Sequence, residues 1–322
     1  MAESGTVTRR DALTAIMFAG TASSASLIAR AAAAQQTGPT VEPAQTSWSE
    51  VPPQVSAVEH TIDVGGARLW AWDTGGTGPA VILMHAYTGS GAAWGYQQPV
   101  LARAGYRVIG YSRRGHFRSE RGPEDAPGTM IGDLLAIADR LDVARFHLVG
   151  TAAGGFSIFD CALAHPERLF SVTLASSQGG IDEPEYLVTN QRLLPPGWRA
   201  LPAEFREVGP SYRAANPRGT QRWIELEQAA LVGDRLTQGK VNRVTWDALK
   251  TITTPVLLMT GGADLYSPPS RLREIAACLQ NCRTAILTEA GHAAFWEQPE
   301  AFNRQLVAHL DANSPTRRGA TG

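Results

Sequence analysis

The stretch Phe146–Gly155, which reads FHLVGTAAGG, decides the fold of this chain. Its apolar first half ends at Gly150, and a helical pattern begins directly after it. A buried strand that turns sharply into a helix between two glycines is typical of a nucleophile elbow, G-x-S-x-G. The glycines are needed because the central residue has a strained backbone and its neighbours leave no room for Cβ atoms. Here the frame is Gly150-Thr151-Ala152-Ala153-Gly154, so Ala152 stands where a nucleophile is expected.

The composition is that of a globular enzyme. The 322 residues predict one or two domains, at roughly 150 residues per domain. Apolar residues make up 43% and charged residues 18%, which permits a sizeable core. The net charge is −1 and no dense basic block lies outside the termini, so we expect no nucleic-acid partner. The three cysteines form no metal-type cluster. The sequence does not decide whether Cys278 and Cys282 form a disulfide.

Residues 1–34 are predicted to be an export signal. Arg9 and Arg10 precede a mildly apolar stretch and then an alanine-rich segment, which is the order of n-region, h-region and cleavage site. The paired arginines resemble a twin-arginine (Tat) signal, so we expect a periplasmic or secreted protein. The alternative is an alanine-rich tail with incidental arginines. No other apolar run reaches the ~20 residues that span a bilayer, so we expect no membrane span once the signal is removed.

The remaining segments predict an α/β fold. Residues 35–56 are rich in Pro and Gln and are predicted to be a linker, and residues 313–322 a disordered tail. Between them strands and helices alternate, which predicts a mostly parallel sheet with helices on both faces. The expected strands are 59–64, 68–73, 80–84, 107–111, 146–149, 171–175, 256–259 and 284–287, and the expected helices 92–104, 130–141, 269–278 and 299–311.

Residues 178–248 interrupt this alternation with helical patterns, several aromatic residues and no strand pattern. An insertion at this point of the chain would lie over the carboxyl ends of the strands, where open α/β sheets bind ligands. We therefore predict a helical cap over 178–248 on a core formed by 57–177 and 249–312.

Four further segments, in chain order, carry a resemblance to a known family. Residues 85–89 read HAYTG, similar to a His-Gly oxyanion loop, and residues 111–115 read YSRRG, similar to an Asp-x-x-Gly turn with Ser112 in place of Asp. Residues 261–264 read GGAD after a buried strand, and Gly291-His292 stands shortly before FWEQPEAFN. Over roughly residues 57–312 the chain resembles capped α/β-hydrolase-fold proteins, of the esterase and meta-cleavage hydrolase kind.

The resemblance implies a role for each matching residue. His292 would be the general base and acid, and Asp264 would hold its tautomer and stabilise the imidazolium. The backbone N–H groups of Tyr87 and Ala153 would form the oxyanion hole. Ala152 departs from the family pattern, because a methyl group cannot attack a carbonyl. Without the resemblance, Asp264 would be a helix cap and His292 a packed loop residue.

Three hypotheses follow. In the first, Ala152 is native and the enzyme works through His292 and Asp264, as a hydrolase, lyase or cofactor-free oxygenase. In the second, the natural protein is a serine esterase or C–C hydrolase whose nucleophile was replaced by Ala152. In the third, the chain is a non-catalytic ligand-binding relative.

We expect a small organic substrate, with a slight preference for an aromatic one, and neither metal nor organic cofactor. The glycines form no G-x-G-x-x-G motif, and no metal-ligand cluster is visible in the sequence. The identity of the substrate and the oligomeric state do not follow from the sequence.

Overall fold

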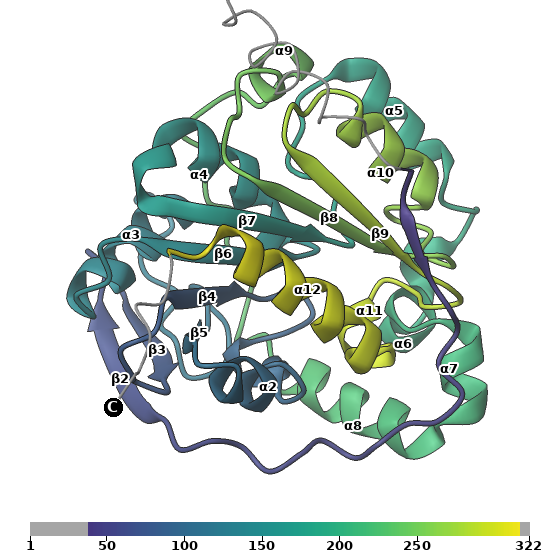
Figure 1. Cartoon of the computed structure of the whole chain (residues 1–322), viewed down its shortest axis with the longest axis horizontal. Coiled ribbons are helices and arrows are strands. Elements are labelled where there is room, and N and C mark those ends of the chain that lie inside the picture. The colour runs from purple at the N-terminus through teal and green to yellow at the C-terminus, as the bar shows by residue number, and fades with distance from the viewer. Residues whose placement is uncertain (1–37, 316–322) are drawn as a thin grey trace, which may run out of the picture. The chain divides into compact units, whose positions relative to one another are not determined.

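The computed structural model describes residues 38–315, and the elements are labelled as in Figure 1. The predicted export signal, 1–34, and residues 316–322 of the predicted tail lie outside the described residues. No helix of the described part is long and apolar enough to cross a membrane.

A nine-stranded sheet, ordered β1-β9-β8-β7-β6-β4-β5-β3-β2, forms the centre of the fold (Figure 1). Pairing is parallel from β1 through β5, whereas β3 pairs antiparallel with both β5 and β2. This confirms the α/β-hydrolase fold class. The strands are β1 (Thr40–Glu42), β2 (Val58–Asp63), β3 (Arg68–Asp73), β4 (Ala80–Met84), β5 (Arg107–Tyr111), β6 (Phe146–Thr151), β7 (Leu169–Ala175), β8 (Val256–Gly261) and β9 (Cys282–Leu287).

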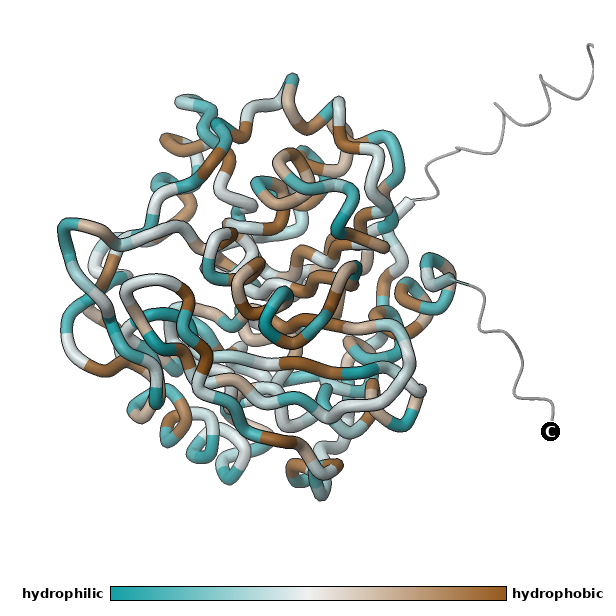
Figure 2. Tube along the Cα trace, turned by 90° about the vertical axis from the view of Figure 1, so that its left-hand side faces the viewer, coloured by the Kyte–Doolittle hydropathy of each residue, from teal (hydrophilic) through white to brown (hydrophobic). Residues whose placement is uncertain are grey.

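Helices cover both faces of the sheet because its central strands are apolar on both sides. In β4, Val81 and Leu83 belong to one core cluster, and Ile82 and Met84 belong to the other. The first cluster includes Phe302 of α12. In Figure 2 brown, apolar segments run through the interior, and teal residues mark many of the outer loops. The helices outside the insertion are η1 (Gly91–Trp94), α2 (Gln98–Arg103), α3 (Met130–Arg140), η2 (Gly154–Ser157), α4 (Ile158–Ala164), η3 (Pro166–Arg168), α10 (Pro269–Ala276), α11 (Ala294–Glu297) and α12 (Pro299–Asn313).

The chain between β7 and β8 is helical, apart from two isolated bridges that join it to other loops. In Figure 1, α5 to α8 lie beyond the carboxyl ends of the strands. This places the insertion at the edge where α/β sheets bind ligands. Its helices are α5 (Pro184–Arg192), η4 (Trp198–Ala200), α6 (Ala203–Glu207), α7 (Pro210–Ala215), α8 (Pro217–Gln228) and α9 (Trp246–Leu249).

Both ends of the described chain differ from their predictions. The linker prediction for 35–56 is wrong at β1, which pairs in parallel with β9 at the edge of the sheet. Beyond it, the Trp48 indole N–H donates to the carbonyl oxygen of Glu297 over 2.8 Å. The tail prediction for 313–322 is wrong at its start, because α12 includes Asn313, and the Ser314 hydroxyl donates to the Leu310 carbonyl over 2.8 Å. The predicted helix 92–104 is two helices, η1 and α2.

Candidate active site

The turn after β6 has the backbone of a nucleophile elbow. Ala152 has φ +48°, a left-handed conformation that is uncommon for residues other than glycine. A Cβ on Gly150 would lie 2.8 Å from the Gly154 carbonyl oxygen, and one on Gly154 would lie 2.4 Å from the Met84 carbonyl oxygen. Both positions therefore require glycine. The Ala152 carbonyl accepts a 2.6 Å hydrogen bond from the Ser177 hydroxyl, which holds the turn.

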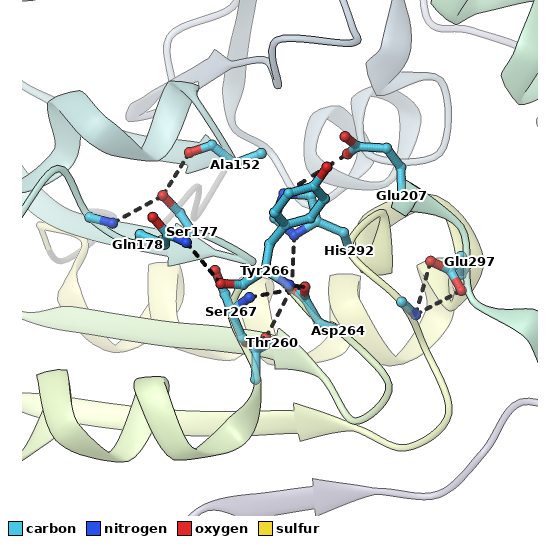
Figure 3. A network of polar contacts seen from close by, with 12 residues as sticks. Ala152, Ser177, Gln178, Glu207, Thr260, Asp264, Tyr266, Ser267, His292 and Glu297 are labelled. Atoms are coloured by element: carbon cyan, nitrogen blue, oxygen red, sulfur yellow. Dashed lines mark hydrogen bonds and ion pairs between the residues drawn. The ribbon is translucent and has the colours of Figure 1, made fainter. Parts of the chain in front are cut away.

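His292 and Asp264 form a buried pair beside this turn (Figure 3). His292 Nδ1 lies 2.8 Å from Asp264 Oδ2. The other carboxylate oxygen of Asp264 accepts hydrogen bonds from the backbone N–H groups of Tyr266, over 2.8 Å, and Ser267, over 3.0 Å. These contacts fix the carboxylate, so the imidazole is oriented with Nδ1 toward Asp264 and Nε2 away from it.

A second carboxylate faces the other nitrogen of His292. Glu207, at the end of α6, has Oε2 3.9 Å from His292 Nε2. Burial raises the pKa of Glu207. Desolvation lowers the pKa of His292, but the negative charges of Asp264 and Glu207 outweigh it and raise this pKa from 6.5 to about 9. The raised pKa favours the imidazolium form of the ring at neutral pH.

A third acidic residue, Glu297 of α11, ties the cap to the loop that carries His292. Its carboxylate accepts hydrogen bonds from Gly291 N–H over 2.9 Å and from Gly209 N–H over 2.9 Å. A Cβ on Gly209 would lie 2.8 Å from the Gly291 nitrogen, so the two loops pass in close contact. Burial raises the pKa of Glu297 to about 8.

The loop after β4 carries Tyr87 beside the elbow. In the described part of the chain, the backbone N–H groups of Tyr87 and Ala153 donate no hydrogen bond. The His85 ring braces this loop, since its Nε2 accepts from Arg113 N–H over 2.9 Å and its Nδ1 lies 2.7 Å from the Ala86 carbonyl oxygen. Burial, with the charge of Arg113 and then that of His116 added, holds the pKa of His85 well below 6.5, so this ring is neutral.

A cavity of about 410 Å³ joins the core to the insertion. Tyr87, Ala152, Ala153 and His292 line it from the core side. Three arginines and two glutamates line it from the insertion: Arg199, Arg206, Arg235, Glu207 and Glu227.

The structure thus brings together all five residues that the sequence singles out. Four of them line one cavity, and Asp264 lies behind His292. Sequence reasoning missed Glu207, which lies in an insertion without any motif. It also left Glu297 without a role, although this residue stands in the quoted segment FWEQPEAFN. Among the described residues, no group of three or more His, Cys, Asp and Glu side chains could hold a metal ion, and Cys161, Cys278 and Cys282 are free thiols.

The comparison with family models agrees with this geometry. The model described as "Alpha/beta hydrolase family" matches residues 81–305. The chain belongs to this family. Its similar family members include the "Putative non-heme bromoperoxidase BpoC" of Mycobacterium tuberculosis (strain CDC 1551 / Oshkosh), 28% identical over 74% of this chain and 95% of that protein. Another is the 2-hydroxy-6-oxononadienedioate/2-hydroxy-6-oxononatrienedioate hydrolase of Paraburkholderia xenovorans (strain LB400), 26% identical over 76% of this chain and 91% of that protein.

A solved structure shares the fold of this chain. A thermophilic esterase from Thermogutta terrifontis, with malate bound, superposes with a TM-score of 0.66 at 24% identity, over 81% of this chain and 100% of that one. The named relatives are hydrolases and bromoperoxidases, which supports an enzyme in general.

Proposed function

We propose that this α/β-hydrolase-family protein is an enzyme that transfers protons on a small organic substrate, with His292 and Asp264 at the centre of its chemistry. The observation that carries the proposal is the 2.8 Å contact between His292 Nδ1 and Asp264 Oδ2 beside a cavity in which the elbow residue is Ala152. The pair retains acid–base chemistry, whereas the methyl group of Ala152 cannot form a covalent intermediate.

The backbone N–H groups of Tyr87 and Ala153 complete the proposed site. Both residues line the cavity, and neither N–H donates to another described residue. Unpaired donors of this kind stabilise an oxygen that becomes negative in the transition state. A substrate with a carbonyl group fits this arrangement, because removal of a proton beside a carbonyl places negative charge on its oxygen.

A second candidate is a serine hydrolase in which Ala152 replaces the nucleophile. Two features favour it: the left-handed backbone at Ala152 and the two glycines that the turn requires. Such a strained turn serves to present a nucleophile, and an alanine does not need it. In that case Ala152→Ser restores the missing hydroxyl in a turn already shaped for it.

One experiment separates the two candidates. The protein, its Ala152→Ser variant and its His292→Ala variant are tested for hydrolysis of 4-nitrophenyl acetate and for exchange of the C–H hydrogens of small ketones, phenylacetone among them, in D2O. We expect the unchanged protein to catalyse exchange and His292→Ala to lose about 100-fold or more of it. An inert protein whose Ala152→Ser variant gains ester hydrolysis by orders of magnitude would identify a serine hydrolase instead.

We also propose that the protein is exported to the periplasm or beyond. The paired Arg9 and Arg10 before a weakly apolar stretch support this. Replacing both by Lys should move the protein from the periplasmic or secreted fraction to the cytoplasmic one in cell fractionation. Unchanged distribution would contradict twin-arginine export.

A further inference from the structure

Three buried carboxylates surround His292, and only one of them lacks hydrogen-bond donors. Asp264 accepts from the Tyr266 and Ser267 backbones as well as from the imidazole. Glu297 accepts from Gly209 and Gly291. The Glu207 carboxylate accepts no hydrogen bond from any residue in the described part of the chain, and its one polar contact is His292 Nε2.

A largely buried carboxylate without hydrogen-bond donors from the protein is unusual. The side chain of Glu207 is nevertheless only 10% exposed, and it lines the cavity together with Ala152 and His292. A carboxylate in this position contributes little to the stability of the fold, but it can contact a ligand in the cavity. Its backbone, by contrast, is firmly held, since the Glu207 carbonyl accepts from Ala293 N–H over 2.8 Å. This backbone hydrogen bond positions the side chain of Glu207 next to His292 and leaves the carboxylate oxygens without a donor.

Glu207 lies next to the nitrogen of His292 that takes part in catalysis in related enzymes. In a serine hydrolase, the imidazole nitrogen that does not face the acid takes the proton of the nucleophile. Here that nitrogen, Nε2, has a carboxylate 3.9 Å away and the methyl group of Ala152 at the elbow (Figure 3). The protein therefore directs a carboxylate toward the nitrogen that in an ordinary family member faces the serine hydroxyl, although Glu207 and Ala152 lie on different sides of the ring (Figure 3).

We propose that Glu207 is a further catalytic residue, the general base of the reaction, and that His292 acts with it as the general acid. This deepens the proposed function and rests on it. The Glu207 carboxylate takes a proton from the C–H group beside the substrate carbonyl, and the electron pair of that bond moves to the carbonyl oxygen. The His292 Nε2–H donates its proton to this oxygen. After product release, the proton on Glu207 passes to His292 Nε2 and restores the starting state, so no oxidant or co-reactant is needed.

The surrounding charges support the assignment of Glu207 as the base and His292 as the acid. Burial raises the pKa of Glu207, with the charges of Asp264 and Glu227 acting in the same direction, while His292 and Arg206 oppose it. A carboxylate with a raised pKa is a stronger base than an ordinary one. The charges of Asp264 and Glu207 outweigh the desolvation of His292 and raise its pKa. The side chain that is charged positively acts as the acid, and the carboxylate facing it acts as the base.

The decisive test is Glu207→Gln, which keeps the size of the side chain and removes its basicity. The readout is exchange of the C–H hydrogens of phenylacetone in D2O, measured against pH. With Glu207 as base, we expect the variant to lose about 100-fold or more of kcat. If His292 is the base instead, the variant should gain activity at pH 7, because loss of a neighbouring carboxylate lowers the pKa of His292 and frees its Nε2. The two mechanisms therefore predict changes of opposite sign, and a gain or no change overturns the proposal.

A matched control and a second readout complete the test. Glu204 lies on the same helix, α6, and does not line the cavity, so Glu204→Gln should leave exchange unchanged. In NMR titrations of the imidazole, Glu207→Gln should lower the pKa of His292 from about 9, and Glu204→Gln should not. Exchange that does not depend on His292 would overturn the proposed function itself, and the role of Glu207 with it. Exchange that depends on His292 but survives Glu207→Gln would overturn only the role of Glu207.

Discussion

At residue 152 the chain has the backbone of a nucleophile elbow but lacks a nucleophilic side chain. The φ of +48° at Ala152 and the tight approach of Gly154 to β4 show that the turn is fully built. Such strain persists only where the surrounding structure holds it. Because the hydroxyl is missing, the proposed chemistry depends on the groups around His292, and the protonation of these groups can be measured.

The protonation of His292 should make the free energy of unfolding depend on pH. Its pKa is about 9 in the folded protein against an ordinary value of 6.5. A raised pKa of this kind gives stability that is fully present below pH 6.5 and is lost as the pH rises through about 9. We expect urea unfolding between pH 6 and 10 to show this loss, and His292→Gln to show a smaller one.

Glu297 acts in the same direction, because its pKa is raised from 4.5 to about 8. The difference between the protein and the variant therefore measures His292 together with its coupling to Glu207. His165, half-exposed at the end of α4, supplies the control His165→Gln. Parallel pH profiles for the protein and His292→Gln would contradict the raised pKa.

Sequence spacing found Asp264 and His292 because each follows a strand or stands in a segment with a recognisable order of residues. Glu207 could not be found in this way. It meets His292 where Gly209 passes in contact with Gly291 and where the Glu207 carbonyl accepts from Ala293 N–H, and this crossing joins segments about 80 residues apart in the sequence. No local pattern encodes such a contact.

At the scale of elements, the strands with sharply bounded apolar runs were predicted to the residue. Strands β4 and β5 match 80–84 and 107–111 because Pro79, Gly105 and Gly115 punctuate the chain around them. The predicted helix 92–104 was too long, since the chain breaks at Gly95 and starts again near Pro99. Strand β1 was missed because three residues carry too little periodicity and its partner, β9, is distant in sequence.

The short helix α11 should prove important for stability through Glu297. In Glu297→Ala the buried N–H groups of Gly209 and Gly291 lose their acceptor. Each stranded donor costs about 1–3 kcal/mol, so we expect the free energy of unfolding to fall by roughly 3 kcal/mol in urea titrations. Glu300→Ala, which removes an exposed carboxylate from α12, is the control and should change it by less than about 1 kcal/mol. A loss for Glu297→Ala as small as that of the control would show that water replaces the carboxylate.

At the scale of the whole molecule, the sheet extends further toward the N-terminus than the sequence indicates. Strand β1 covers the outer edge of β9, and Glu42 carries contacts from this strand to Arg304 and Gln305 of α12. Cleavage of the predicted export signal after residue 34 would leave β1 in the mature chain. The segment that the sequence predicts to be a linker is therefore, in part, an edge strand of the sheet.

Removal of β1 should expose the edge of β9 and promote association between copies of the chain. A chain that begins at residue 44 leaves the outer N–H and C=O groups of β9 unpaired, and such edges pair with other chains. A chain that begins at residue 39 keeps β1 and is the matched control. We expect the shorter chain to unfold about 4 °C or more below the control, as a loss of about 2 kcal/mol would give for a domain of this size. Light scattering should show concentration-dependent association of the shorter chain alone. Equal midpoints and equal scattering for the two chains would mean that β1 rests on the sheet without stabilising it.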